Sequence, residues 1–265
     1  MSLRLFDIGV NLVHPRFHAD RGGVIERAQK AGVQNMVVTG TNARASRSAL
    51  ELARAHPGVL YSTAGVHPHD ARHCNEDTVA ELGDLAKSPE VVAIGECGLD
   101  FDRDFSPRPL QERCFEAQVA LACELRRPLF LHERDAHARF VGILKGYRSR
   151  LPAAVVHCFT GSATELKAYL DLDLHIGITG WICDERRGSH LLELIRRIPP
   201  HRLMLETDAP LLTPRNMSAR PRDGRNEPAF LPWVLRAVAT SLGRPEEQVA
   251  EETTQTALRF FGIEG

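Results

Sequence analysis

The chain has 265 residues, a length that one large domain accommodates, since α/β barrels of about 250 residues fold as single units. Hydrophobic residues make up 43% and charged residues 25%, which is the composition of a globular protein. The formal net charge of -1 excludes a strong overall attraction to nucleic acid, so such a partner requires a local basic patch.

The start of the chain and its cysteines indicate a compartment. The first ten residues, MSLRLFDIGV, lack the basic and apolar regions of a signal peptide, and no window reaches the roughly 18 consecutive apolar residues of a membrane span. The six cysteines form no C-x-x-C pair, which is typical of reduced thiols. We therefore expect a cytoplasmic protein with no membrane partner.

Eight short apolar runs recur along the chain, each followed by a polar turn. In chain order they are LRLFDIGV, NMVVTGT, VLYSTAGVH, VVAIGECGLD, RPLFLHERD, AAVVHCFTG, LHIGITG and RLMLETDAP. Runs this rich in Val, Ile, Leu and small residues are typical of parallel strands buried on both faces. Helical patterns lie between them, and the one after the fourth run is predicted to begin at an N-cap, Ser106, and to end before Pro128.

Eight strands alternating with helices favour the α/β class and a closed (β/α)8 TIM barrel as one domain over residues 1–265. The alternative is an open doubly wound sheet. No G-x-G-x-x-G phosphate loop follows the first run, which counts against a dinucleotide-binding sheet of that kind. A barrel places its site at the carboxyl ends of several strands.

Ligand-type side chains follow most of the predicted strands. They are His67 and His69 after the third run, Glu96 in the fourth, His132 in the fifth, His157 in the sixth and Asp208 in the eighth. One such residue alone is more often a turn residue with satisfied hydrogen bonds, but the set at separate strand ends favours a metal site. Mixed imidazole and carboxylate ligands suit Zn, Mn or Mg. Cys97 and Cys158 alternate with these positions, so we expect both thiols in the core.

Cations gather in the stretch LLTPRNMSARPRDGRNEP after the eighth run. Its arginines are Arg215, Arg220, Arg222 and Arg225, and CDERRG after the seventh run adds Arg186 and Arg187. Guanidinium groups suit bidentate contacts with phosphate, so this stretch is a candidate phosphate clamp. The alternative is a solvated loop whose charges serve solubility.

The motifs DIGVNL, TAGVHPHD, VVAIGECGLDF, VVHCFTG, CDERRG, LETDAP and RNEP together resemble the TatD-type metal-dependent deoxyribonucleases, over residues 6 to about 262. This resemblance implies an amidohydrolase-like (β/α)8 hydrolase that acts as a 3'-5' exonuclease on single-stranded DNA and RNA, in DNA repair or nucleic-acid turnover. It implies a divalent cation, Mg2+ first and Zn2+ or Mn2+ as alternatives, and a monomer with no obligate protein partner.

The resemblance also implies residue roles. The metal ligands are Glu96, His132, His157 and Asp208; the catalytic residues are Asp208, Glu96, His67 and His69; the substrate-binding residues are Arg222, Arg225, Asn226 and Glu227. One departure concerns the first strand. Many relatives carry Asp-x-His-x-His there, whereas this chain keeps Asp7 but has Gly9 and Asn11. A neutral amide is a weak ligand for a transition metal, so we expect Asp7 to orient a neighbour or the turn rather than to bind metal.

The hypothesis for the reaction is phosphodiester hydrolysis, in which a divalent ion activates water, Asp208 takes the proton, and His67 and His69 assist the phosphate or the leaving oxygen. Two other classes stay open. One is a small-molecule lactonase, amidase or phosphotriesterase on the same barrel, although the fifth run ends in His rather than a bridging Lys. The other is a non-catalytic binding module.

Overall fold

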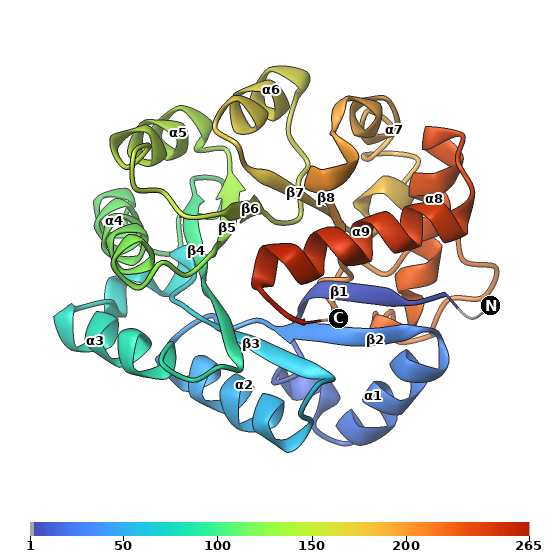
Figure 1. Cartoon of the computed structure of the whole chain (residues 1–265), viewed down its shortest axis with the longest axis horizontal. Helices are drawn as coiled ribbons and strands as arrows, with labels where there is room; N and C mark the ends of the chain where they lie inside the picture. Colours follow the sequence, from blue (N-terminus) through green and yellow to red (C-terminus); the bar gives the residue numbers. More distant parts are fainter. Residues whose placement is uncertain (1–2, 265) are drawn as a thin grey trace. The chain divides into compact units, whose positions relative to one another are not determined.

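The computed structural model describes residues 3–264, so the extreme ends of the predicted domain, residues 1, 2 and 265, lie outside the described residues. Eight strands form one sheet in the order β1 to β8 (Figure 1). Their bounds are β1 Leu5–Val10, β2 Val33–Val38, β3 Leu60–Ala64, β4 Val91–Asp100, β5 Leu129–Arg134, β6 Ala154–Val156, β7 His175–Ile178 and β8 Leu203–Leu205. The pairs β3 to β4, β4 to β5, β5 to β6 and β7 to β8 are parallel.

Helices alternate with these strands. The α-helices are α1 Arg21–Lys30, α2 Ala43–Ala55, α3 Glu76–Leu85, α4 Arg108–Leu125, α5 His137–Gly146, α6 Ala163–Asp171, α7 Leu191–Leu194, α8 Leu231–Leu242 and α9 Glu246–Phe261. Short 3-10 helices are η1 Pro15–Phe17, η2 Pro68–His73, η3 Gly180–Cys183, η4 Ile195–Arg197, η5 Pro200–Arg202 and η6 Pro228–Phe230. This order of strands and helices is that of the (β/α)8 fold, and the predicted fold class is confirmed.

The chain divides into two compact units. Unit 1 comprises residues 1–37, 158–163 and 176–265, and unit 2 comprises residues 38–157 and 164–175. The organisation as one domain over residues 1–265 stays a prediction. No helix within residues 3–264 combines the length and apolarity needed to cross a membrane.

Unit 2 holds α2 to α5 on the outer side of β3, β4 and β5 (Figure 1). Helix α4 packs on β4, and its buried Phe115 stacks on Phe140 of α5 at 5.2 Å. The prediction that Ser106 caps this helix is wrong, because α4 begins at Arg108 and its N-cap residue is Pro107. Ser106 is buried and its hydroxyl instead donates to the backbone carbonyl of His69 at 2.8 Å.

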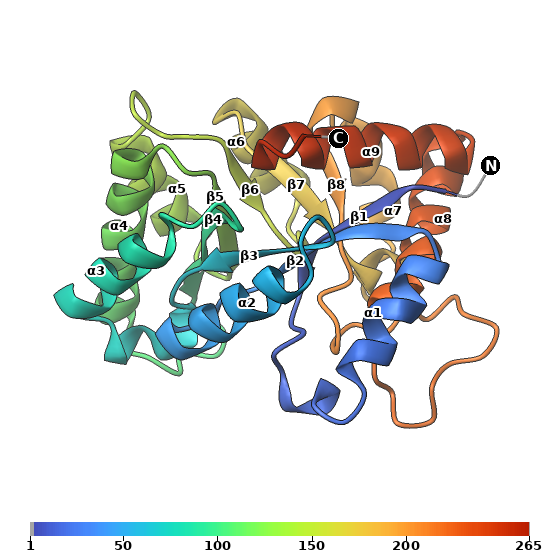
Figure 2. The same ribbon diagram turned by 60° about the horizontal axis from the view of Figure 1, so that its bottom comes forward.

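Unit 1 holds β1, β8 and the C-terminal helix α9, which lies beside β1 in Figures 1 and 2. Phe6 of β1 stacks on Phe261 of α9 with ring centroids 5.7 Å apart. A long connection follows β8 and leads to η6, and it is the orange loop of Figure 2. The prediction for the thiols is half right. Cys97 is fully buried, whereas Cys158 is partly exposed, because β6 ends at Val156 and Cys158 has a φ of 49°.

Two glycines of β4 allow β5 to approach closely. Gly95 and Gly98 have φ of 138° and 149°, which L side chains rarely adopt. A Cβ at Gly98 would lie 1.8 Å from the backbone oxygen of His132, and one at Gly95 would lie 2.2 Å from that of Phe130. The sequence GECG therefore brings His132 beside β4, since any larger residue at position 98 would push β5 away.

We predict that Gly98→Ala destabilises the protein and displaces His132. Backbone strain and overpacking together give a cost of roughly 2–5 kcal/mol in the free energy of unfolding. Gly142→Ala in α5 is the control, because its Cβ would meet nothing within 4 Å, and a stabilisation of up to about 1 kcal/mol is expected from helix propensity. Denaturant unfolding of both variants measures the difference, and equal stabilities would contradict this account of the glycine.

Candidate functional site

Glu96 occupies a bulge in β4. Gly95 pairs with Phe130 and Cys97 pairs with Leu131, so Glu96 is the extra residue on its strand. A bulge redirects the side chain of the unpaired residue. The carboxylate of Glu96 is buried, at 5% exposure, and it faces side chains from three other segments of unit 2.

Three imidazoles converge on one oxygen, Glu96 Oε1. His157 Nε2 lies 2.8 Å from it, His132 Nδ1 lies 2.9 Å from it, and His67 Nε2 lies 3.2 Å from it. The three rings come from different strand ends, namely after β6, within β5 and at the residue that precedes η2. The predicted meeting of Glu96, His67, His132 and His157 therefore occurs within unit 2.

The histidines determine the charge of Glu96. Burial alone would raise the pKa of this carboxyl, but the electrostatic effect of the His157 and His67 rings and the hydrogen bonds from His132 and His157 hold it well below its usual range. Burial also opposes charge on His132, but hydrogen bonds to Asp100 and Glu96 raise its pKa. The site is thus built around a buried anion that requires cationic or hydrogen-bonding partners.

His67 differs from the other two rings in its tautomer. Its Nδ1 accepts a hydrogen bond from the backbone N–H of His69 at 3.1 Å. A ring nitrogen that accepts a hydrogen bond carries no proton, so the ring proton of His67 is on Nε2, the nitrogen that faces Glu96. A metal ligand offers a lone pair at the coordinating atom. His67 therefore donates a hydrogen bond toward Glu96 in this arrangement. The ligand atoms of His67, Glu96 and His132 all lie within 4.8 Å of one another, close enough for these three residues to hold a metal ion.

The donor atoms fit a divalent cation. Adjacent ligands around a cation with bonds of about 2.1 Å lie about 3 Å apart. Glu96 Oε1 lies at 2.8 and 2.9 Å from the nearest nitrogens of His157 and His132. His132 Nε2 is buried, and Asp100 Oδ2 lies 3.5 Å from it. Such a carboxylate and imidazole set is compatible with Mg2+, Mn2+ or Zn2+.

Asp100 is a site residue that the sequence analysis missed. Its Oδ2 lies 2.7 Å from His69 Nε2, and hydrogen bonds from His132 and His69 lower its pKa against the effect of burial. From sequence alone, side-chain alternation along a strand predicts that Glu96 and Asp100, four residues apart, share a face, and in the structure both carboxylates lie near His132. The second carboxylate of GECGLD is therefore a signal in the sequence that identifies Asp100 as a site residue.

Asp208 lies in unit 1, three residues after β8, in the left-handed region at φ 51°. Its Oδ1 accepts a hydrogen bond from the side-chain amide of Asn11 at 2.9 Å, and its backbone N–H donates to Gly9. Asn11 and Gly9 thus hold Asp208 in place. Whether Asp208 shares a cation with Glu96 stays a prediction.

Asp7 is fully buried beneath this turn. It accepts hydrogen bonds from the Thr207 hydroxyl at 2.5 Å and from the Thr207 backbone N–H at 2.9 Å. Burial raises the pKa of Asp7 to about 8 in spite of these hydrogen bonds. Asp7 therefore orients the residue before Asp208, as the sequence analysis expected.

One of the predicted substrate-binding residues, Asn226, fixes the same turn. Asn226 is fully buried, donates to the carbonyl oxygens of Thr207 and Leu211, and so closes the turn around Asp208. Glu227 accepts two hydrogen bonds from Arg27 and one from Arg225.

The guanidinium of Arg225 donates four hydrogen bonds: one to the backbone oxygen of Arg16, two to Asp20 and one to Glu227. Asn226, Glu227 and Arg225 are thus engaged in hydrogen bonds within the protein. Of the four predicted substrate-binding residues, Arg222 is the exposed cation.

An arginine-lined hollow of about 390 Å³ lies beside this turn in unit 1. It is lined by Arg16, Arg186, Arg187, Arg215 and Arg220 together with Trp181, Asp184 and the stretch 210–213. Asp184 is buried and pairs with Arg186 and Arg187 at 3.2 Å, and its pKa is lowered mainly by Arg186. Arg187 also lies over the ring of Trp181, 4.3 Å from its centroid.

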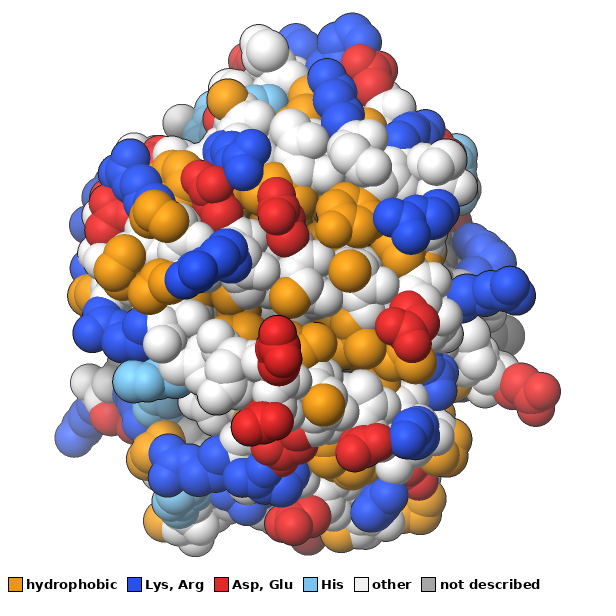
Figure 3. All heavy atoms as spheres, turned by 90° about the vertical axis from the view of Figure 1, so that its left-hand side faces the viewer, with side chains coloured by type: hydrophobic (Ala, Val, Ile, Leu, Met, Phe, Trp, Pro, Cys, Tyr) orange, Lys and Arg blue, Asp and Glu red, His pale blue; other side chains and the backbone are white. Residues whose placement is uncertain are grey.

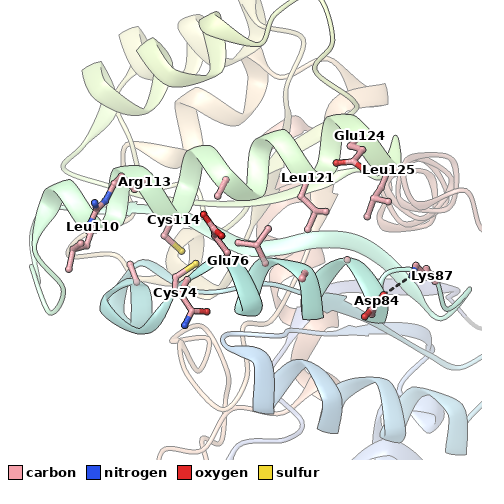
Figure 4. Close-up of a pocket in the computed structure, with 16 residues that line it drawn as sticks. Cys74, Glu76, Asp84, Lys87, Leu110, Arg113, Cys114, Leu121, Glu124 and Leu125 are labelled. Atoms are coloured by element: carbon pink, nitrogen blue, oxygen red, sulfur yellow. Dashed lines mark hydrogen bonds and ion pairs between the residues drawn. The ribbon is translucent and has the colours of Figure 1, made fainter.

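A different hollow, of about 770 Å³, lies between α3 and α4 in unit 2. Figure 4 shows Cys74 and Cys114 facing each other in it, with Asp84 paired to Lys87 farther along. Its lining contains none of the clustered histidines and neither Glu96 nor Asp100. The face drawn in Figure 3 carries cations and anions interspersed, so it offers no broad patch of one sign.

A (β/α)8 fold with carboxylate and imidazole side chains at the strand ends has the features of the metal-dependent hydrolases built on this barrel. A family model described as TatD related DNase matches residues 6–262. The chain belongs to the TatD-related DNase family.

Among curated relatives, the 3'-5' ssDNA/RNA exonuclease TatD of Erwinia tasmaniensis is 54% identical and that of Pantoea ananatis is 52% identical, each over 98% of this chain and 100% of the relative. Among solved structures, the TatD homologue YJJV of Escherichia coli K12 is 27% identical with a TM-score of 0.90, covering 100% of both chains. An uncharacterised amidohydrolase of Saccharomyces cerevisiae is 27% identical with a TM-score of 0.88, covering 97% of this chain and 99% of its own.

We predict that Asp7 gives the protein a pH-dependent stability. The pKa of Asp7 is about 8 in the folded chain and 3.8 in the unfolded one, so the folded state binds more protons between these values. The contribution of Asp7 to the free energy of unfolding therefore falls as the pH rises from about 4 to about 8. The side chain of Asp7→Asn is neutral at every pH, so this variant should lack the part of the pH dependence that comes from Asp7. Denaturant unfolding between pH 4 and 9 tests this, and parallel curves for the two proteins would contradict it.

Proposed function

We propose that this protein is a divalent-metal-dependent 3'-5' exonuclease that hydrolyses the phosphodiester bonds of single-stranded DNA and RNA. The observation that carries the proposal is the convergence of three imidazoles from separate strand ends on one oxygen of Glu96. Relatives 52% and 54% identical over 98% of the chain bear this activity in their names. No observation favours the small-molecule hydrolase or the binding module.

The proposal assigns Glu96, His132 and His157 to hold the cation, with Asp208 as a further ligand. A divalent cation, when bound, polarises a phosphoryl oxygen and lowers the pKa of water beside it. Magnesium is the proposed cation in function, because its hard character suits carboxylate oxygens and phosphate.

The protein side chains then move the protons. Asp208 accepts the proton of the attacking water, and Asn11 holds its carboxylate in position for this role. His67, whose Nε2–H faces Glu96, stabilises the charge that develops on the phosphate beside this carboxylate. His69, bonded to Asp100, gives its proton to the leaving 3' oxygen, with Asp100 stabilising the charged ring.

Arg222 is the proposed phosphate contact, and Arg225, Asn226 and Glu227 hold the loop that presents it. The arginine-lined hollow supplies further cations for the backbone of the strand. We also propose that the protein acts as a cytoplasmic monomer in DNA repair or nucleic-acid turnover. The six free cysteines suit a reducing compartment.

We predict that Glu96→Gln and His157→Ala each lower kcat/KM for mononucleotide release from a 3'-ended single-stranded oligonucleotide with Mg2+ by at least about 10²-fold. The reason is the loss of a ligand from the buried set. His201→Ala is the control, because this imidazole is exposed and lies in η5. Calorimetric titration with Mn2+ measures the cation affinity of each variant. Full activity in Glu96→Gln would refute the assignment.

Arg222 and Arg225 are expected to differ. Arg222→Ala should raise KM and reduce the slope of log KM against log salt by about one charge, with thermal stability unchanged. Arg225→Ala should lower the free energy of unfolding by about 1–3 kcal/mol, because Glu227 loses a hydrogen-bonded partner. Steady-state kinetics from 50 to 200 mM salt and thermal unfolding separate the two roles. A clamp role for Arg222 is wrong if neither KM nor the salt slope moves.

A further inference from the structure

Phe105 is an exposed aromatic side chain in unit 2. It lies in the connection from β4 to α4 and is 53% exposed. Within residues 3–264, the other exposed large hydrophobic side chains are Leu192 at 39% and Leu211 at 53%. Phe105 is the aromatic member of this group. Single exposed apolar side chains are common on protein surfaces, so the neighbours of this ring decide what its exposure means.

The ring of Phe105 lies against the candidate site. It makes an edge contact with His69, with centroids 4.6 Å apart and planes at 66°. His69 contacts His67 at 4.2 Å, and His67 contacts His132 at 4.5 Å. Phe105 is thus the outermost member of a row of four rings, of which His67 and His132 contact Glu96.

The backbone around Phe105 is held at several points. The next residue, Ser106, is fully buried; its hydroxyl donates to His69 O at 2.8 Å and accepts from Arg72 N–H at 3.0 Å. Gln111 donates to the carbonyl of Ser106 at 2.8 Å. On the other side, Asp104 pairs with Arg108 at 2.7 Å. These bonds fix the loop with the phenyl ring in solvent, so the ring is presented before any ligand binds.

We propose that Phe105 stacks on a base of the single strand, within the nucleotides next to the scissile phosphate; this inference rests on the proposed exonuclease function. A phenyl ring has no hydrogen-bond donor for phosphate, so a base is the part of the strand that Phe105 can hold. The π-face of every base is available to an aromatic side chain, so stacking gives affinity without sequence preference. A base inside a duplex has both faces covered, and therefore this contact selects unpaired 3' ends.

The test compares Phe105→Ala, Phe105→Tyr and Leu192→Ala on four oligonucleotides, one intact and three lacking the base at the first, second or third nucleotide from the 3' end. Phe105→Ala should raise KM for the intact strand about tenfold or more with kcat changed little. It should have no further effect on the one strand that lacks the stacked base. Phe105→Tyr keeps the ring and should behave as the wild type, as should Leu192→Ala on the exposed surface of α7.

Binding is measured separately by fluorescence anisotropy with Glu96→Gln and with Glu96→Gln combined with Phe105→Ala. Stacking is supported if Phe105→Ala weakens binding of the intact strand but not of one base-free strand. This holds even if the wild type cleaves no strand, and that lack of cleavage would refute the exonuclease proposal alone. The inference is overturned if Phe105→Ala leaves KM and affinity unchanged, or if it weakens all four strands equally. Thermal unfolding of Phe105→Ala excludes a loss of structure.

Discussion

The buried carboxylate of Glu96 is the constraint on which the site depends. A carboxylate removed from water is stable only when positive or donor groups surround it. Here the groups are three imidazoles whose nearest nitrogens lie 2.8 to 3.2 Å from one oxygen. Because these rings come from separate strand ends, the electrostatic requirement of one side chain ties together segments that lie 29 to 61 residues from it in the chain.

The backbone of β4 is adapted to that requirement. The bulge aims Glu96 away from the strand ladder, and Gly98 lets the backbone of His132 approach. Asp100, two residues farther, then reaches His69 and His132 from the same face. Strand β4 therefore contributes both carboxylates, Glu96 and Asp100, and neighbouring segments contribute the histidine rings that contact them. The hydrogen bond to His67 Nδ1 adds a distinction within the cluster, since it leaves the proton of this ring on the nitrogen that faces Glu96.

The strand ends could be located from sequence because apolar runs and their terminal polar residues form a regular pattern. This pattern gave the fold class and the meeting of Glu96 with His67, His132 and His157. Asp100 was within reach by the same alternation of side chains. The position of Cys158 was not, because β6 is short and the chain leaves strand geometry at that residue.

Long-range partners account for the rest. Arg225 has the appearance of a phosphate contact in a basic loop, but Asp20, 205 residues away, engages its guanidinium. Ser106 is a residue type that often caps helices, but its hydroxyl donates a hydrogen bond to His69 in another segment. Local patterns do not show such pairings, since they depend on the folded chain. Asn11 is a similar case, because the loss of an imidazole is visible in sequence but its bond to Asp208 is not.

Asn226 has a consequence for how this protein can vary. Its side chain ties together Thr207 and Leu211 on either side of Asp208, and its backbone N–H bonds to Pro210. These hydrogen bonds thereby join the two ends of the long connection after β8. Residues 212 to 225 lie between the points that these hydrogen bonds join. The length and charge of this segment can therefore differ without loss of the bonds by which Asn226 closes the turn around Asp208.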